Sequence, residues 1–152
     1  MKARALGVDD LELVCRHREA MFRESGRSDD VLRTMTAQFR PWLAPRLRDG
    51  SYFGFVLMDG GEAVAGIGLM AIDWPPHPSH PTQDKRGYVL NVYVEQAYRK
   101  QGLGRRLMQL AEDEFAERKL QFAILHATEM GRPLYVALGW HATTEMAKAV
   151  GA

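Results

Sequence analysis

Residues 92–106 read VYVEQAYRKQGLGRR and form the most informative stretch of the sequence. They begin in an apolar strand expected over residues 87–94, which is followed at once by a turn containing Gly102 and Gly104. The apolar spacing beyond this turn predicts a helix from about Gly102 to Arg118. A helix that starts in this way leaves backbone N–H groups unpaired beside the positive end of its dipole. The turn is therefore predicted to bind phosphate oxygens.

The charges around this predicted helix are reversed relative to those of a free helix. Basic side chains crowd its amino-terminal end at Arg99, Lys100, Arg105 and Arg106, whereas acidic side chains occupy residues 112–117. Each cation at a helix start is unfavourable by about 0.3–1 kcal/mol, and a bound polyanion would reverse that sign. A solvated cluster of arginines and lysines is the simpler alternative, and the charges alone leave both interpretations open.

Two common nucleotide motifs do not fit the turn. A dinucleotide fingerprint needs a third glycine where this chain has Leu107. A P-loop needs Gly-Lys-Ser/Thr, where the chain has Gly104-Arg105-Arg106. The phosphate ligand is therefore expected to belong to another class.

Composition narrows the possibilities further. The 152 residues include 46% hydrophobic and 26% charged side chains, and 20 basic against 19 acidic groups give a net charge of +1. These values are typical of one globular domain, expected to span residues 1–152, and they argue against disorder, a nucleic-acid partner and an acidic membrane surface. A single cysteine, Cys15, excludes an internal disulfide. With no apolar signal segment at the amino terminus, a soluble, cytoplasmic protein is expected.

The pattern along the chain predicts an α/β fold with the order β-α-α-β-β-β-α-β-α-β. Pro41 is expected to end or kink the second helix, and Asp59-Gly60-Gly61 is expected to form a hairpin turn. A helical crossover between the two most apolar strands requires parallel pairing in at least one place, so the sheet is expected to be mixed. The remaining strands are expected near residues 3–6, 52–58, 63–72, 121–127 and 140–146, and a short helix near 131–138.

Two motifs at the correct separation carry a family resemblance. Residues 99–104 read Arg-Lys-Gln-Gly-Leu-Gly, and residues 133–140 contain Pro-Leu-Tyr followed by Leu-Gly-Trp. Together they resemble the GNAT superfamily of acyl-CoA-dependent N-acyltransferases. The resemblance is clear over residues 87–146, while the amino-terminal half matches only in element order. It implies a mostly antiparallel mixed sheet with splayed central strands, flanked by helices, and direct transfer of an acetyl group from acetyl-CoA to an amine.

The resemblance also implies which residues bind acetyl-CoA. Exposed backbone of the strand ending at Val94 would pair with the pantetheine arm, and an N–H of Val94 or a neighbour would meet the developing oxyanion. Backbone N–H groups of residues 101–105 would hold the pyrophosphate, assisted by basic side chains. Thr128 stands where many members have an asparagine, and it either contacts the arm or caps the short helix. The full set is Val92, Tyr93, Val94, Arg99, Lys100, Gln101, Gly102, Leu103, Gly104, Arg105 and Thr128.

Three residues are candidates for catalysis, of which the resemblance itself implies only Tyr135. Tyr135 resembles the tyrosine that protonates the departing thiolate, and a phenol is protonated at neutral pH. Asn91 is expected to orient water or substrate, and His126 is the candidate proton acceptor because it titrates near neutral pH. A hydrogen-bonded histidine at a strand end is the simpler interpretation of His126. Glu95 and Glu129 are further candidates, although solvated loop carboxylates are the simpler description of both.

Several alternatives remain open at this stage. A non-catalytic acyl-CoA-binding module on the same fold would bind the ligand without releasing a thiol, and a nucleic-acid module would use the cluster at residues 99–106. His77 and His80 are expected to serve the loop at residues 74–82, without a metal, because no third ligand is nearby. Trp74, Phe39 and Trp42 are candidates for the wall of the acceptor site. The amine acceptor is not identified, and a homodimer is implied only by the resemblance.

Overall fold

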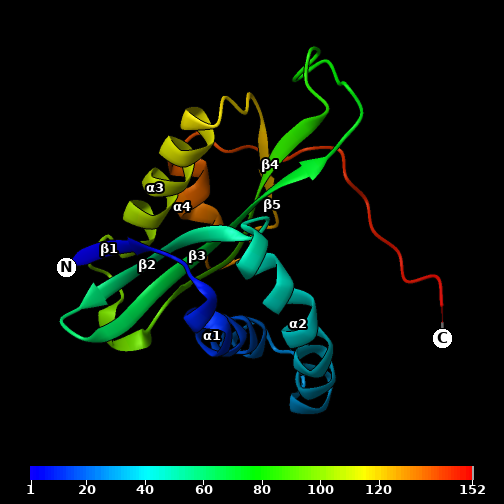
Figure 1. The fold of residues 1–152 in the computed structure, drawn as a ribbon. Coiled ribbons are helices and arrows are strands. Elements are labelled where there is room, and N and C mark those ends of the chain that lie inside the picture. The colour runs from blue at the N-terminus through cyan, green and yellow to red at the C-terminus, as the bar shows by residue number, and fades with distance from the viewer. Residues whose placement is uncertain (152) are drawn as a thin grey trace.

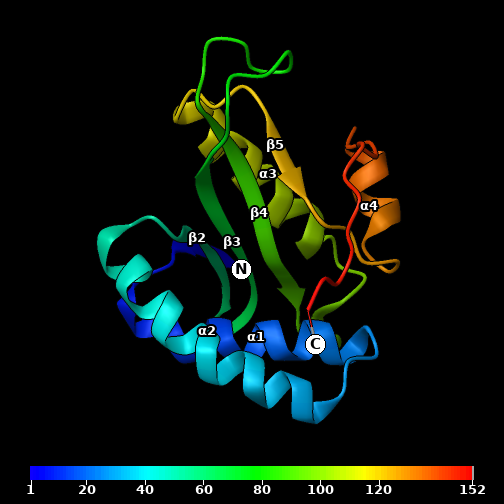
Figure 2. The same ribbon diagram turned by 90° about the vertical axis from the view of Figure 1, so that its right-hand side faces the viewer.

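The computed structural model describes residues 1–151, in which one five-stranded sheet has the strand order β1-β2-β3-β4-β5 (Figure 1 and Figure 2). Helices cover both faces of this sheet. The strands are β1 (Lys2–Ala5), β2 (Phe53–Asp59), β3 (Glu62–Asp73), β4 (Lys85–Val94) and β5 (Ala123–Leu125). The helices are α1 (Leu11–Glu24), α2 (Asp29–Asp49), α3 (Leu103–Glu117) and α4 (Arg132–Ala137), with short 3₁₀ turns η1 (Val8–Asp10) and η2 (Gln96–Tyr98).

The strand directions follow from the connections. β1 through β4 pair antiparallel, and β2 and β3 are joined by the tight turn at Gly60 and Gly61, as predicted. β4 and β5 pair parallel because α3 carries the chain across between them. The predicted α/β class with a mixed, mostly antiparallel sheet is therefore confirmed.

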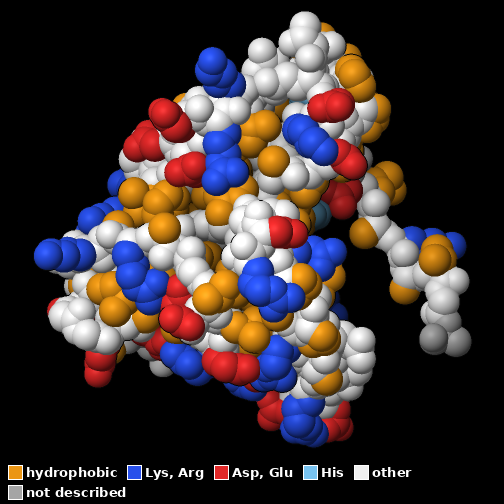
Figure 3. Space-filling view, in the orientation of Figure 1, with side chains coloured by type: hydrophobic (Ala, Val, Ile, Leu, Met, Phe, Trp, Pro, Cys, Tyr) orange, Lys and Arg blue, Asp and Glu red, His pale blue; other side chains and the backbone are white. Residues whose placement is uncertain are grey.

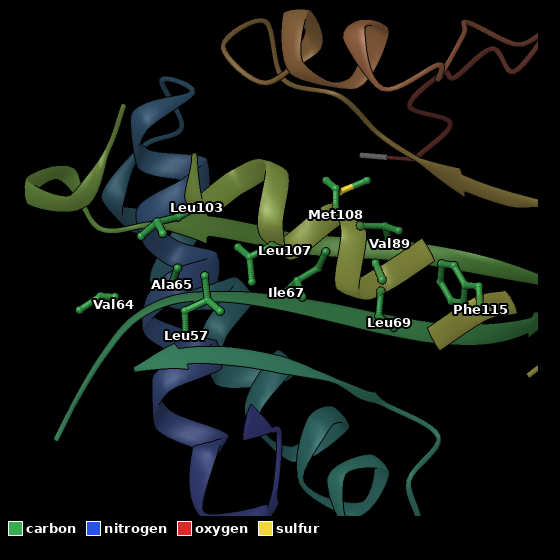
Figure 4. Close-up of a cluster of buried hydrophobic side chains, with 11 residues drawn as sticks. Leu57, Val64, Ala65, Ile67, Leu69, Val89, Leu103, Leu107, Met108 and Phe115 are labelled. Atoms are coloured by element: carbon green, nitrogen blue, oxygen red, sulfur yellow. The ribbon is translucent and has the colours of Figure 1, made fainter. Parts of the chain in front are cut away.

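Separate apolar layers fill the two sides of the sheet. On one face the side chains of α3 interlock with those of β2, β3 and β4, so that Leu107, Met108 and Ala111 are fully buried (Figure 4). On the other face α1 and α2 enclose a second cluster around Leu43 and Tyr52. Because both faces are covered, β3 and β4 are nearly continuous apolar runs.

Of the two outcomes predicted at Pro41, an end or a kink of the second helix, the first is wrong. α2 continues through both Pro41 and Pro45 to Asp49. The apolar side chains before and after Pro41 repeat every four residues, and Phe39, Leu43 and Leu47 are all buried. The burial of this continuous stripe offsets the loss of about 3 kcal/mol that a proline causes inside a helix.

The predicted last strand over residues 140–146 is also wrong. After α4 the Trp140 N–H donates to the Tyr135 carbonyl oxygen, and residues 141–151 then run as an extended, exposed segment without strand pairing. Figure 3 shows this segment leaving the body of the protein. Among residues 1–151, no helix has the combined length and apolar character that crossing a membrane requires.

Candidate active site

β4 has two strand neighbours along only part of its length. It pairs with β5 through Gly87, Tyr88 and Val89, whereas β3 follows it as far as Val94. From Leu90 onward, no strand within residues 1–151 pairs with the backbone of β4 on the β5 side. An extended ligand with amide groups can pair with such a free strand edge.

A bulge in β4 lies where β5 separates from it. Asn91 has a φ of 57°, and the β3–β4 register shifts opposite it, between Gly66 and Gly68. The buried Asn91 side chain donates from Nδ2 to the Tyr52 hydroxyl at 2.8 Å and accepts at Oδ1 from Arg18 Nη1 at 2.7 Å. Both ends of this amide are therefore held by protein groups on the α1/α2 face of the sheet.

The turn after β4 presents an uncapped helix start. Lys100 and Gly102 both have left-handed backbone conformations, with φ of 63° and 79°. Gly102 is the residue before the first turn of α3, and no side chain caps that turn. Within residues 1–151 the first backbone N–H groups of α3 thus have no side-chain acceptor, and phosphate binding by these groups stays a prediction.

The basic side chains of this turn are not equivalent. Arg99 donates to the Val94 carbonyl oxygen and to Glu24, and Arg106 donates to the Met1 carbonyl oxygen at 2.7 Å. Lys100 and Arg105 are exposed and form no ion pair with any of the residues that the structure describes. The structure therefore leaves Lys100 and Arg105, rather than Arg99, as free cations at the helix start.

Glu24, at the end of α1, joins the turn to β4. Its carboxylate accepts from Arg99 Nη2 at 2.7 Å and from the Tyr93 hydroxyl at 2.6 Å. Burial, followed by the hydrogen bond to Glu24, raises the pKa of Tyr93 to about 12. The Tyr93 side chain faces α1, so only its backbone is available along the free edge of β4.

α4 packs against the start of α3. A Cβ added to Gly104 would lie 3.0 Å from Leu134 Cδ2, so the glycine at this position also allows close helix packing. The neighbouring Tyr135 is half-buried on this helix, and its burial raises the pKa of the phenol. The structure thus brings the tyrosine motif and the glycine motif to the same end of the α3 layer (Figure 2).

Thr128 and His126 occupy the segment between β5 and α4. Thr128 Oγ1 accepts from the Gly131 N–H at 3.1 Å, which corresponds to the predicted capping role. His126 is 58% exposed at its side chain, and its ring lies edge-on to Tyr88 with 5.8 Å between centroids. Its Nε2 is 3.7 Å from Glu145 Oε2, so His126 lies at a strand end within reach of solvent.

Sequence reasoning missed three polar side chains near the bulge, those of Arg18, Tyr52 and His17. Arg18 and Tyr52 meet Asn91 from α1 and from the loop before β2. His17 is 3% exposed, and its Nε2 lies 3.3 Å from Glu95 Oε1. The sequence signal for His17 and Arg18 is that they form a polar pair within the amphipathic stretch of α1.

The histidines of the loop at residues 74–82 form hydrogen bonds within the loop and to residues next to it. His80 is fully buried; its Nδ1 lies 3.0 Å from the Gln83 carbonyl oxygen, and its Nε2 accepts from Arg86 Nε at 3.2 Å. Arg86 in turn lies 4.0 Å from the Trp74 ring centroid. Within residues 1–151 no group of three potential ligand side chains could hold a metal ion.

Comparison with known proteins agrees with this geometry. The family model described as "Acetyltransferase (GNAT) family" matches residues 12–140. The chain is 63% identical to a GCN5-related N-acetyltransferase from Ralstonia eutropha JMP134, whose crystal structure superposes with a TM-score of 0.97 over 98% of this chain and 97% of that one. A predicted acetyltransferase from Clostridium acetobutylicum, crystallised with acetyl-CoA, shares the fold at 21% identity, with a TM-score of 0.88 over 98% of this chain and 95% of that one. The chain therefore belongs to the GNAT acetyltransferase family and is an acetyl-CoA-dependent N-acetyltransferase.

Proposed function

We propose that this enzyme transfers the acetyl group of acetyl-CoA directly to an amine while both are bound. The observation that carries this proposal is the continuity between the unpaired stretch of β4 and the uncapped start of α3. One stretch of chain, residues 90–105, thus offers strand hydrogen bonds followed by a phosphate site. An acyl-CoA needs these two features in this order.

Different groups of the chain would bind different parts of acetyl-CoA. Backbone of Val92 to Val94 would pair with the amide-containing arm, and the N–H groups of Gln101 to Arg105 would hold the pyrophosphate. Lys100 and Arg105 would add charge from their exposed side chains. Arg99 would contribute indirectly, because its hydrogen bonds to Val94 and Glu24 fix the turn.

Acetyl-CoA supplies an activated thioester, so holding the two reactants in place provides much of the catalysis. A backbone N–H at Val94 or a neighbouring residue would stabilise the charge that develops on the carbonyl oxygen. As the amine nitrogen bonds to the acetyl carbon and the carbon–sulfur bond breaks, Tyr135 would give its proton to the sulfur. Burial keeps Tyr135 protonated at neutral pH, as this role requires.

An amine that arrives as ammonium must first lose a proton. We assign this step to His126 acting through water, because the ring is exposed at the end of β5 and carries no stronger contact than Glu145 at 3.7 Å. Asn91 would position this region by holding Arg18 and the bulge of β4. Thr128 would order the turn that leads to Tyr135.

Thermal melting with and without acetyl-CoA tests the binding site. Acetyl-CoA should raise the melting temperature of the wild type, and the double variant Lys100→Glu/Arg105→Glu should lose most of this increase. The matched control is Arg48→Glu/Lys119→Glu, which reverses two exposed charges at the end of α2 and beyond the far end of α3, and it should retain the increase. An equal increase in all three proteins would contradict the proposed phosphate site.

A thiol-release screen of amine classes tests the transfer itself. The proposal predicts CoA release that depends on both acetyl-CoA and an amine. A protein that is stabilised by acetyl-CoA but releases no thiol with any amine would instead be an acyl-CoA-binding module.

A further inference from the structure

Arg18 is a partly buried, positively charged side chain that forms no ion pair with any of residues 1–151. Its guanidinium carbon lies 5.0 Å from the Phe22 ring centroid and 4.7 Å from that of Phe39. Nη1 donates to Asn91 Oδ1 at 2.7 Å, whereas the buried Nε has no hydrogen-bond partner among residues 1–151. A guanidinium has five donor hydrogens, and these contacts use only part of that capacity.

No carboxylate of the described chain forms an ion pair with Arg18. The ionisable groups that face it are Tyr52, Tyr88 and Cys15, which are neutral at neutral pH. Burial lowers the pKa of Arg18, as expected for a cation without a compensating charge. By contrast, Arg23, Arg33 and Arg40 of α1 and α2 each form an ion pair with an aspartate or glutamate.

The location of Arg18 connects it with the transfer reaction. Its partner Asn91 lies at the bulge of β4, two residues after the last pair between β4 and β5. This is the point where the free edge of β4 begins, next to the proposed site of acetyl transfer. Arg18 is close enough to Tyr88 to affect its pKa, and the Tyr88 ring contacts that of His126, so Arg18 lies in the same region as the proposed proton acceptor.

We propose that Arg18 binds a carboxylate of the acceptor, which makes the acceptor a small amine that also carries a carboxylate, such as an amino acid. This inference rests on the proposed transfer function. A carboxylate would supply the missing negative charge and accept from the unused guanidinium donors. Because Arg18 is close to the transfer site, amine and carboxylate should be separated by only a few bonds.

The test compares acids with matched neutral amines. Thiol release from acetyl-CoA is measured with free amino acids and with their α-carboxamides, in wild type and in Arg18→Gln. In wild type, kcat/KM for the best acid should exceed that for its carboxamide by about 10- to 100-fold, the range expected for a charged hydrogen bond. Arg18→Gln should reduce this ratio to near one, and Arg18→Lys should retain part of it.

A purely structural Arg18 gives a different pattern. In that case Arg18→Gln would lower turnover of acids and carboxamides by the same factor and leave their ratio unchanged, which would overturn the inference. Arg16→Gln, an exposed arginine on the same helix, is the matched control and should not alter the ratio. Acetylation of neutral amines alone would also overturn the inference while leaving the proposed transfer function intact. Loss of stabilisation by acetyl-CoA would overturn the proposed function instead.

Discussion

Arg99 Nε donates a hydrogen bond of 2.9 Å to the carbonyl oxygen of Val94, the last residue of β4. The same guanidinium donates to Glu24 and lies 5.3 Å from the Tyr93 ring centroid. Arg99, the first residue of the glycine motif, is therefore held by contacts with Val94, Glu24 and Tyr93. We expect Arg99 to hold the end of β4 against the turn, whereas Lys100 and Arg105 form no ion pair within residues 1–151 and can contact an anion.

Arg99 and Glu24 are expected to act as one unit in stability. Arg99→Ala and Glu24→Ala should each lower the free energy of unfolding by about 1.5–3 kcal/mol, because each leaves a partly buried charge without its partner. The double variant should lose less than the sum of the two single losses. Urea unfolding of the four proteins measures this coupling, and strict additivity would show that the pair is not coupled.

Tyr135→Phe is expected to lower turnover while leaving acetyl-CoA binding nearly unchanged. The substitution keeps the half-buried ring and removes only the proton donor, so the expected loss in kcat is about 100-fold or more. Steady-state kinetics and binding of acetyl-CoA measure the two effects separately. Tyr98→Phe makes the same change at a tyrosine that bonds Asp59, and it should retain turnover. If both variants are equally active, Tyr135 is a packing residue.

The local parts of this site were predictable from sequence because neighbours in the chain create them. The end of β4, the turn and the start of α3 form one continuous segment, and the tyrosine motif lies on the short helix α4 and the residues directly after it. Gly102 has the left-handed backbone conformation that glycine adopts readily, which ties the motif directly to its geometry.

Contacts between distant segments were not predictable in the same way. Asn91 meets Tyr52 across 39 residues and Arg18 across 73, so no local pattern indicates that they touch. The failure at residues 140–146 has a related cause. A strand needs a partner, and sequence alternation does not reveal whether that partner lies in the same chain.

His17 should make the protein less stable as the pH falls below neutrality. Burial lowers the pKa of His17 from its ordinary 6.5, and the nearby Glu95 opposes this shift in part. Between the folded and unfolded pKa values the unfolded chain holds more protons, so the stability present above pH 6.5 is lost as the pH decreases. The slope from one such group cannot exceed about 1.4 kcal/mol per pH unit.

Urea unfolding at several values between about pH 7.5 and about pH 5 measures this dependence. His17→Gln should flatten the curve in that window, whereas His141→Gln, at an exposed histidine, should leave it unchanged. A wild-type curve that stays parallel to that of His17→Gln would exclude His17 as the source.

Gly68→Ala is expected to destabilise the protein from the centre of β3. A Cβ at this position would lie 1.9 Å from the Tyr52 hydroxyl oxygen and 2.4 Å from Cζ, and Tyr52 is fully buried. The ring must move, which breaks the hydrogen bond that Asn91 donates to it. The expected cost is about 1–3 kcal/mol in the free energy of unfolding, as for other overpacked cores. Gly61→Ala, where an added Cβ meets nothing within 4 Å, is the control and should be nearly neutral.

The same substitution should also affect the acceptor side of the site. Asn91 holds Arg18 through its Oδ1, so displacement of Tyr52 loosens both residues. Gly68→Ala is therefore expected to reduce the preference for amino acids over their carboxamides, even at a temperature where the variant remains folded. Circular dichroism verifies folding, and thiol release measures the preference. A variant with full stability and an unchanged preference would show that the packing of Tyr52 does not position Arg18.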